Sequence, residues 1–340
     1  MHMSDALIST AVGSTMAAVS TGAVGYSIKK IKAADLSDGR IPMMGVMGAF
    51  VFAAQMINFT IPGTGSSGHI GGGILLAALL GPYPAFLTIT SVLIIQALFF
   101  ADGGLLALGC NIFNMGFLTC FVAYPLIYKL ILRKSIKPKK ISLAAILAVV
   151  VGLQLGAFAV VTETTVSGIT ELPFMVFVLP MQSIHLAIGI VEGLITGAVL
   201  CFVYRTRKEI ITNTLEKSNN HKFSKKKVLI FFAVAAVVIG GFLSYFASSN
   251  PDGLEWAIQG IVGDKELANN SDSHASAEKL QSKTALLPDY TFEGKAKDNK
   301  LGTGLSGLVG GAATLTVTIL TGVVVVRYKK MKVKKLSKAD

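Results

Sequence analysis

The sequence predicts an all-α integral membrane protein, and three observations point to this fold class. Charged residues make up 15% of the 340 residues and hydrophobic residues 52%, against about 25% and 45–50% in soluble proteins. The hydrophobic residues gather in long runs, many of which reach the about 20 residues that a helix needs to cross a bilayer. The basic residues, which give a net charge of +12, lie mainly at the ends of these runs.

Nine hydrophobic elements follow one another along the chain. They are residues 7–28, 41–59, 70–80, 85–100, 105–128, 141–161, 182–204, 228–246 and 303–326. The element at 70–80 is too short to span a bilayer fully. Glu163 and Glu171 are assigned to a polar loop that follows the sixth element. We expect three parts: residues 1–205 with about seven transmembrane helices, a basic cytoplasmic linker at 206–227, and residues 228–340 with two transmembrane helices and an extracellular loop at 247–302.

The distribution of Lys and Arg predicts the orientation in the cell membrane. Cytoplasmic loops of membrane proteins collect these residues. With the N-terminus outside, the predicted inner segments 29–40, 129–140, 205–227 and 327–340 hold 25 of the 31 Lys and Arg residues. The other six lie in the long outer loop, and long loops translocate regardless of charge. The predicted topology is therefore N-terminus outside and C-terminus cytoplasmic. The net positive charge is explained by the cytoplasmic segments of a membrane protein rather than by nucleic-acid binding.

The first three residues, Met1-His2-Met3, form a candidate metal chelate. The α-amino nitrogen, the backbone nitrogen of His2 and the His2 imidazole can close two fused rings around one ion. Three nitrogens in a plane suit square-planar Ni(II) or Cu(II). Met1 to Ser9 lacks the basic start of a signal peptide, so we expect these residues to be retained. The alternative is that His2 belongs to a frayed tail.

A second histidine, His69, stands in the glycine-rich segment 60–73. Irregular backbone at membrane depth persists only where protein or a water-filled cavity satisfies its amide groups. The segment is either a surface hairpin or a loop that turns inward toward a site. Because Met1 starts on the same outer side, His69 is the candidate for the fourth corner of the chelate.

Polar residues inside the membrane are costly and often functional. Asp102, Asn111 and Asn114 lie near the outer ends of their helices, within reach of His2 or His69, and a metal-bound histidine usually donates its other N–H to such a group. His185 could play the same role. It stands seven residues from Glu192 on one helical face, and an internal hydrogen bond is the alternative role for these residues.

Small residues spaced four apart form a stripe on the first helix. The stripe consists of Gly13, Ala17, Thr21 and Gly25. Such a stripe lets two helices approach closely in lipid. It serves either packing inside the chain or docking of a partner membrane protein.

No enzymatic motif accompanies these features. The sequence lacks a His-Glu-x-x-His zinc motif, a nucleophile elbow and a phosphate-binding loop that ends in Lys-Ser or Lys-Thr. The three cysteines lie in apolar segments at no metal-like spacing. The chain is therefore not expected to be an enzyme or to hydrolyse ATP.

Several motifs resemble the nickel/cobalt substrate-binding (S) component of energy-coupling factor transporters, the NikM/CbiM family. They are Met-His-Met-Ser-Asp-Ala at 1–6, Gly-Ser-Ser-Gly-His-Ile-Gly-Gly-Gly at 65–73, Phe-Phe-Ala-Asp-Gly-Gly at 99–104, Gly-Cys-Asn-Ile-Phe-Asn-Met-Gly at 109–116 and His-Leu-Ala-Ile-Gly at 185–189. The motif Pro-Asp-Gly-Leu-Glu at 251–255 resembles the small two-helix accessory component, fused as in NikMN proteins.

The resemblance implies a fold, a ligand set and partners. It implies an S-component helical bundle with an extra N-terminal helix, and an ion bound by the Met1 amine, the His2 amide nitrogen and imidazole, and His69. The ion is transported Ni(II) or Co(II), with no resident cofactor. The implied partners are a transmembrane coupling protein, which the stripe on the first helix would contact, and two cytoplasmic ATPases. The alternatives are an S component for another small substrate, such as a vitamin, and an integral-membrane metalloenzyme.

Overall fold

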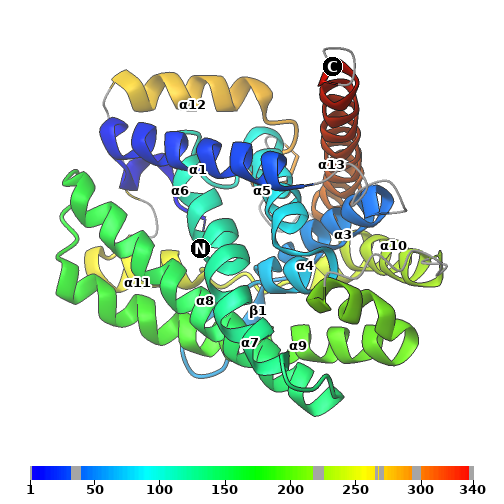
Figure 1. Cartoon of the computed structure of the whole chain (residues 1–340). Coiled ribbons are helices and arrows are strands. Elements are labelled where there is room, and N and C mark those ends of the chain that lie inside the picture. The colour runs from blue at the N-terminus through cyan, green and yellow to red at the C-terminus, as the bar shows by residue number, and fades with distance from the viewer. Residues whose placement is uncertain are drawn as a thin grey trace.

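Figure 1 shows the computed structural model of the chain, in which residues 2–31, 40–216, 226–264, 267, 272–292 and 300–336 are described. Most of this part is helical. Up to residue 216 the helices are η1 (Asp5–Leu7), α1 (Thr10–Lys30), α3 (Arg40–Gln55), α4 (Gly73–Leu80), α5 (Pro82–Phe100), α6 (Leu108–Asn111), η2 (Ile112–Tyr128), α7 (Lys129–Leu132), α8 (Pro138–Ser167) and α9 (Phe174–Glu216). They are followed by α10 (Lys226–Gly241), η3 (Leu243–Phe246), α11 (Gly253–Val262), α12 (Asp272–Thr284), η4 (Pro288–Tyr290) and α13 (Lys300–Leu336).

Five helices of the described part are long and apolar enough to cross a membrane. They are Pro82–Phe100, Leu108–Leu132, Pro138–Ser167, Phe174–Glu216 and Gly302–Met331. Helix α3 is apolar but shorter, with 16 residues. The predicted class, a helical multi-pass membrane protein, is confirmed.

The second of these spans is one continuous helix made of α6, η2 and α7. Its middle part, η2, is a π-helix, in which backbone hydrogen bonds reach five residues back. The N–H of Lys129, for example, donates to the carbonyl of Tyr124. Pro125 lies inside this stretch, and a proline ring cannot accept the close packing of a regular α-helical turn. The start of this helix carries Asn111 and Asn114, which makes its position important for the site.

Several boundaries differ from the prediction, among them the starts of α9 and α4 and the end of α3. Glu163 does not lie in a loop, because α8 continues to Ser167 and buries this side chain. Residues 208–216, which the sequence places in a linker, are helical after a break in the helix at Arg207. Ile211 of this stretch is fully buried, so it packs against the bundle. Residues 217–225 of the predicted linker lie outside the described part.

Small residues allow the helices to pack closely. Helix α8 packs along α9, and α13 packs along α3 and α10, as Figure 1 shows. Where α10 meets α13, a Cβ on Gly307 would lie 2.2 Å from the Gly240 carbonyl oxygen. A Cβ on Gly310 would lie 2.0 Å from the Phe52 ring. Close approach at small residues is how helices associate in lipid, where burial of apolar surface gives no driving force.

A two-stranded antiparallel hairpin interrupts the helical chain. Strand β1 (Phe59–Ile61) pairs with β2 (Ser66–Gly68), and Phe59 stands opposite Gly68. The turn contains Gly63 and Gly65, both with a positive φ, which glycine adopts without steric cost. Ser66 and Ser67 are fully buried. The two readings of this segment therefore both apply: it is a hairpin, and its second strand turns inward and presents His69.

Candidate metal centre

The chain before α1 is held in place rather than frayed. The Met3 N–H donates to Oδ1 of Asn111 at 2.8 Å, and Nδ2 of Asn111 donates to the Met3 carbonyl at 3.1 Å. The N–H of Gly104 donates to the same carbonyl at 2.9 Å. The Asp5 carboxylate accepts the N–H groups of Leu106 and Ala107 at 2.8 and 3.0 Å. The arm at 2–9 is thus ordered against residues 103–111, which positions His2.

His2 meets His69 in the interior. Their rings stack with centroids 5.1 Å apart and an angle of 18° between the planes. The His2 side chain is 8% exposed, and its Nε2 is buried without a hydrogen bond of ordinary length to a described residue, although the Gln96 side chain lies near enough to interact with the ring. A buried polar nitrogen without a partner is costly, and a metal ion would satisfy it.

Burial keeps both imidazoles uncharged. Desolvation lowers the pKa of His69 from 6.5 to about 3 and also lowers that of His2. A neutral imidazole carries a free lone pair, which is the form that binds a metal. The two rings are therefore ready to act as ligands near neutral pH.

Asp102 orients His2. Its Oδ1 lies 3.3 Å from Nδ1 of His2, so Nε2 is the nitrogen left for an ion. Its other oxygen, Oδ2, accepts a hydrogen bond from the Tyr290 hydroxyl, and the Tyr290 ring stacks on Phe100. A carboxylate on the far nitrogen is the usual partner of a metal-bound histidine.

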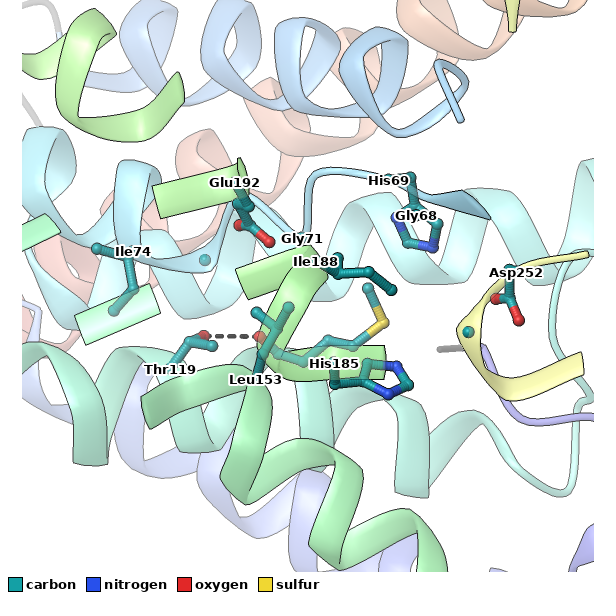
Figure 2. Close-up of a pocket in the computed structure, with 13 residues that line it drawn as sticks. Gly68, His69, Gly71, Ile74, Thr119, Leu153, His185, Ile188, Glu192 and Asp252 are labelled. Atoms are coloured by element: carbon teal, nitrogen blue, oxygen red, sulfur yellow. Dashed lines mark hydrogen bonds between the residues drawn. The ribbon is translucent and has the colours of Figure 1, made fainter. Parts of the chain in front are cut away.

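A small cavity of about 30 Å³ lies beside His69. Figure 2 shows its lining, with His69, His185 and Asp252 at one end and Glu192 at the other. Nδ1 of His185 bonds to the Met181 carbonyl at 2.8 Å. Oε1 of Glu192 accepts the N–H of Gly72 at 2.9 Å. Each of these two side chains therefore makes a hydrogen bond inside the protein, which is the alternative role predicted for them.

Four of the predicted site residues lie near one another. His2 contacts both His69 and Asp102, and His185 lines the cavity beside His69. Asn111 bonds to the backbone of Met3 rather than to a histidine. Nδ2 of Asn114 lies 3.7 Å from the Met3 sulfur and donates to Glu163 at 2.7 Å.

Met1 lies outside the described residues, so its place in the site stays a prediction. Among the residues that are described, no three His, Cys, Asp or Glu side chains come together as a metal cluster would.

Comparison with known proteins identifies the family. Residues 2–210 match the family described as "Cobalt uptake substrate-specific transmembrane region" (CbiM), and residues 226–327 match the PDGLE domain. The chain belongs to the CbiM family, with a PDGLE domain fused to it.

Relatives and solved structures agree with this family assignment. The chain is 31% identical over 330 residues, 97% of its own length and 99% of the relative's, to a candidate fused nickel transport protein NikMN from Archaeoglobus fulgidus. The fused nickel transport protein NikMN of Rhodobacter capsulatus is 30% identical, over 62% of this chain and 64% of that protein. A crystal structure of a truncated transition metal transporter matches 61% of this chain and 99% of its own chain, with 33% identity and a TM-score of 0.53.

The CbiM region contains buried polar residues that the sequence did not single out as parts of the site. Nε2 of Gln96 donates to Oε1 of Gln55 at 2.7 Å, and Nε2 of Gln55 donates to the Gly71 carbonyl at 3.0 Å. Glu163 supports Asn114. The sequence does contain a signal for these residues, because an amide or a carboxylate in an apolar run is costly and therefore often functional. This signal identifies the residues but does not show which groups they bond to.

The PDGLE domain contributes Tyr290 and Asp252, and neither was predicted. Tyr290 is 188 residues from Asp102 in the chain. Asp252 belongs to a motif noted in the sequence, but nothing local connects that motif to His69. Only the fold brings both residues to the site.

The stripe on α1 is divided by the structure. Gly13 is buried, and a Cβ there would lie 2.8 Å from the Leu106 carbonyl oxygen. It therefore serves packing inside the chain rather than an exposed docking face. Ala17, Thr21 and Gly25 are exposed, but the backbone of Ala17 also packs inside the chain, because a Cβ on Gly109 would lie 2.3 Å from the Ala17 nitrogen.

Proposed function

We propose that this protein captures Ni(II) or Co(II) at the outer side of the cell membrane with high affinity. The ion is then delivered into the cell as part of an ATP-driven energy-coupling factor transporter. The proposed ligands are the Met1 amine, the amide nitrogen and imidazole of His2, and the imidazole of His69. Asp102 fixes the His2 ring, Asn111 and Asn114 hold Met3, and His185 lines the adjoining cavity.

The observation that carries this proposal is the stacked pair of buried, neutral histidines. The His2 ring stacks on the His69 ring, and its Nε2 makes no hydrogen bond of ordinary length to a described residue. A neutral imidazole nitrogen of this kind can bind a metal ion. The ordered arm at 2–9 supports a role for the start of the chain. Nitrogen ligands in a plane suit square-planar Ni(II) or Cu(II).

The size of the cavity favours an ion over a vitamin. About 30 Å³ is close to the volume of one water molecule in the liquid. A vitamin-sized ligand needs a pocket of about 300–1,000 Å³.

We further propose nine membrane elements, seven before residue 206 and two after residue 227, with the N-terminus outside and the C-terminus in the cytoplasm. The contact between Lys329 Nζ and the Lys29 carbonyl, at 2.7 Å, supports this topology. This contact places the basic C-terminal ends of α1 and α13 on the same side of the membrane, as the rule for cytoplasmic Lys and Arg requires.

The proposed partners are a transmembrane coupling protein and two cytoplasmic ATPases. This proposal rests on the family, because the sequence has no phosphate-binding loop of its own. The exposed small residues Ala17, Thr21 and Gly25 on α1 give a surface that a partner helix could approach closely.

An extension of the N-terminus by three glycines tests the proposed chelate. It converts the α-amine into an amide and moves the histidine from the second position to the fifth, too far from the new α-amine to share an ion with it in fused rings. We expect calorimetry to detect tight Ni(II) and Co(II) binding to the native chain and none to the extended chain. The control carries the same three glycines at the C-terminus and should bind normally. Native affinity in the N-terminally extended chain would overturn the chelate.

A further inference from the structure

We propose that Asp252 of the PDGLE domain is part of the metal site, where its carboxylate supplies negative charge to the bound cation. This inference rests on the proposed function and adds a role for the fused domain. In it, the Pro-Asp-Gly-Leu-Glu motif joins the domain to the ion held by the CbiM region.

The backbone before Asp252 is tied to the strand that precedes His69. The N–H of Ser67 donates to the Pro251 carbonyl at 2.8 Å, and the Ser67 hydroxyl donates to the Asn250 carbonyl at 2.8 Å. Helix α11 is anchored to the same hairpin, because Nε1 of Trp256 donates to the Thr64 carbonyl at 2.9 Å. The motif and the loop that carries His69 are thus one connected unit.

A capping box fixes the position of the carboxylate. Oδ1 of Asp252 accepts the N–H groups of Leu254 and Glu255 at 2.8 and 2.9 Å. Oε2 of Glu255 accepts the N–H of Asp252 at 3.1 Å in return. These reciprocal bonds hold Asp252 as the N-cap of α11 and leave little freedom for its side chain to turn away.

Gly253 lets this cap approach the cavity. A Cβ at this position would lie 3.1 Å from Cε1 of His185 and 3.0 Å from Cδ1 of Ile188. Both contacts are tighter than ordinary van der Waals distance, so only glycine fits without displacement. The start of α11 therefore closes one end of the cavity, where Asp252 faces His69 and His185 in Figure 2.

The carboxylate is close enough to act on both candidate ligands. Asp252 interacts electrostatically with the imidazoles of His2 and His69. An imidazole binds a metal in its neutral form, so imidazole ligands bring no charge to balance a divalent ion. An anion beside the site lowers the free energy of the bound cation, and more strongly in a buried place than in water.

The experiment compares Asp252→Asn with Glu255→Gln in the full chain with its native N-terminus. Asparagine caps a helix about as well as aspartate, so Asp252→Asn removes the charge and keeps the fold. Glu255→Gln removes a carboxylate from the same capping box, and Glu255 does not line the cavity. Both chains are checked by thermal unfolding before Ni(II) titration by calorimetry.

We expect Asp252→Asn to weaken Ni(II) binding at least tenfold, by analogy with groups that support a metal site from outside its ligand set, whose loss costs about 10–100-fold. Glu255→Gln should bind as the native chain does. The visible absorption band of bound Ni(II) should keep its position in Asp252→Asn, because the nitrogen ligands are unchanged. Asp252→Ser, which also caps, repeats the test if the first variant does not fold.

The outcomes separate this inference from the proposed function. If Asp252→Asn and Asp252→Ser bind Ni(II) within twofold of the native chain, Asp252 is only a helix cap and the inference is wrong, while the proposed function stands. If Glu255→Gln weakens binding as much as Asp252→Asn, the effect reflects the cap and again not the charge. If the native chain binds neither Ni(II) nor Co(II), the proposed function and the inference fall together.

Discussion

Replacing Asn111 by alanine should weaken metal binding by loosening the arm that carries His2. Asn111 makes two hydrogen bonds to the backbone of Met3, and its side chain is 1% exposed. After the substitution the Met3 carbonyl keeps its bond from Gly104. The Met3 N–H has no other described acceptor, so it is left buried and unpaired.

The structure sets the size of this effect. A buried donor left unpaired costs about 1–3 kcal/mol, and the second bond, whose acceptor keeps a partner, is worth about 0.5–1.5 kcal/mol. Together they destabilise the ordered arm by about 1.5–4.5 kcal/mol, which corresponds to about 12- to 1,600-fold in an equilibrium constant. Burial of Met3, Leu7 and Ile8 continues to hold the arm, so we expect an effect in the lower part of this range, about 30-fold weaker Ni(II) binding.

Calorimetric titration of the purified chain with its native N-terminus measures this loss. Gln154→Ala is the matched control, because it removes an amide that bonds to the Gln182 carbonyl at 2.9 Å between α8 and α9. Gly103→Ala tests the same contact from the other side, since its Cβ would lie 2.8 Å from Nδ2 of Asn111. If Asn111→Ala folds and binds Ni(II) within threefold of the native chain, the arm does not position the ligand as inferred.

Three further predictions concern residues around the site. Tyr290→Phe keeps the ring but removes the hydroxyl that bonds to Asp102, so we expect about tenfold weaker Ni(II) binding. The control is Tyr245→Phe in η3, which removes a tyrosine hydroxyl elsewhere and should leave Ni(II) binding unchanged. Because burial lowers the pKa of His69 from 6.5 to about 3, the unfolded chain binds more protons than the folded one between these values. Thermal stability should therefore fall as the pH drops from about 6.5 toward 3, and less steeply in His69→Gln. Glu192→Leu removes the acceptor of the Gly72 N–H and should cost about 1–3 kcal/mol of stability, whereas Glu192→Gln keeps an acceptor and should be mild.

Each of these predictions has a result that contradicts it. Equal Ni(II) affinities for Tyr290→Phe and the native chain would mean that Asp102 orients His2 without help from the PDGLE domain. A His69→Gln chain with the native dependence of melting temperature on pH would show that His69 is not the group that titrates. A Glu192→Leu chain as stable as the native one would show that the Gly72 N–H finds another acceptor.

The sequence alone determined the class of this protein and the centre of its candidate site. Hydropathy and the placement of Lys and Arg act over about 20 consecutive residues, so they can be read without knowing the fold. His2 and His69 stood out for a similar reason. Each lies in a short local context, the start of the chain or a glycine-rich loop, whose chemistry is visible in a few residues.

The tertiary structure decided which residues complete that site. Asn111 was predicted to support a histidine but holds the Met3 backbone, and His185 and Glu192 each bond to a separate backbone group. Tyr290 reaches Asp102 across 188 residues. Such pairings depend on how helices far apart in the chain pack together. A periodic pattern tells which face of a helix is polar, but the partner of that face is set by long-range packing, which no local pattern of residues encodes.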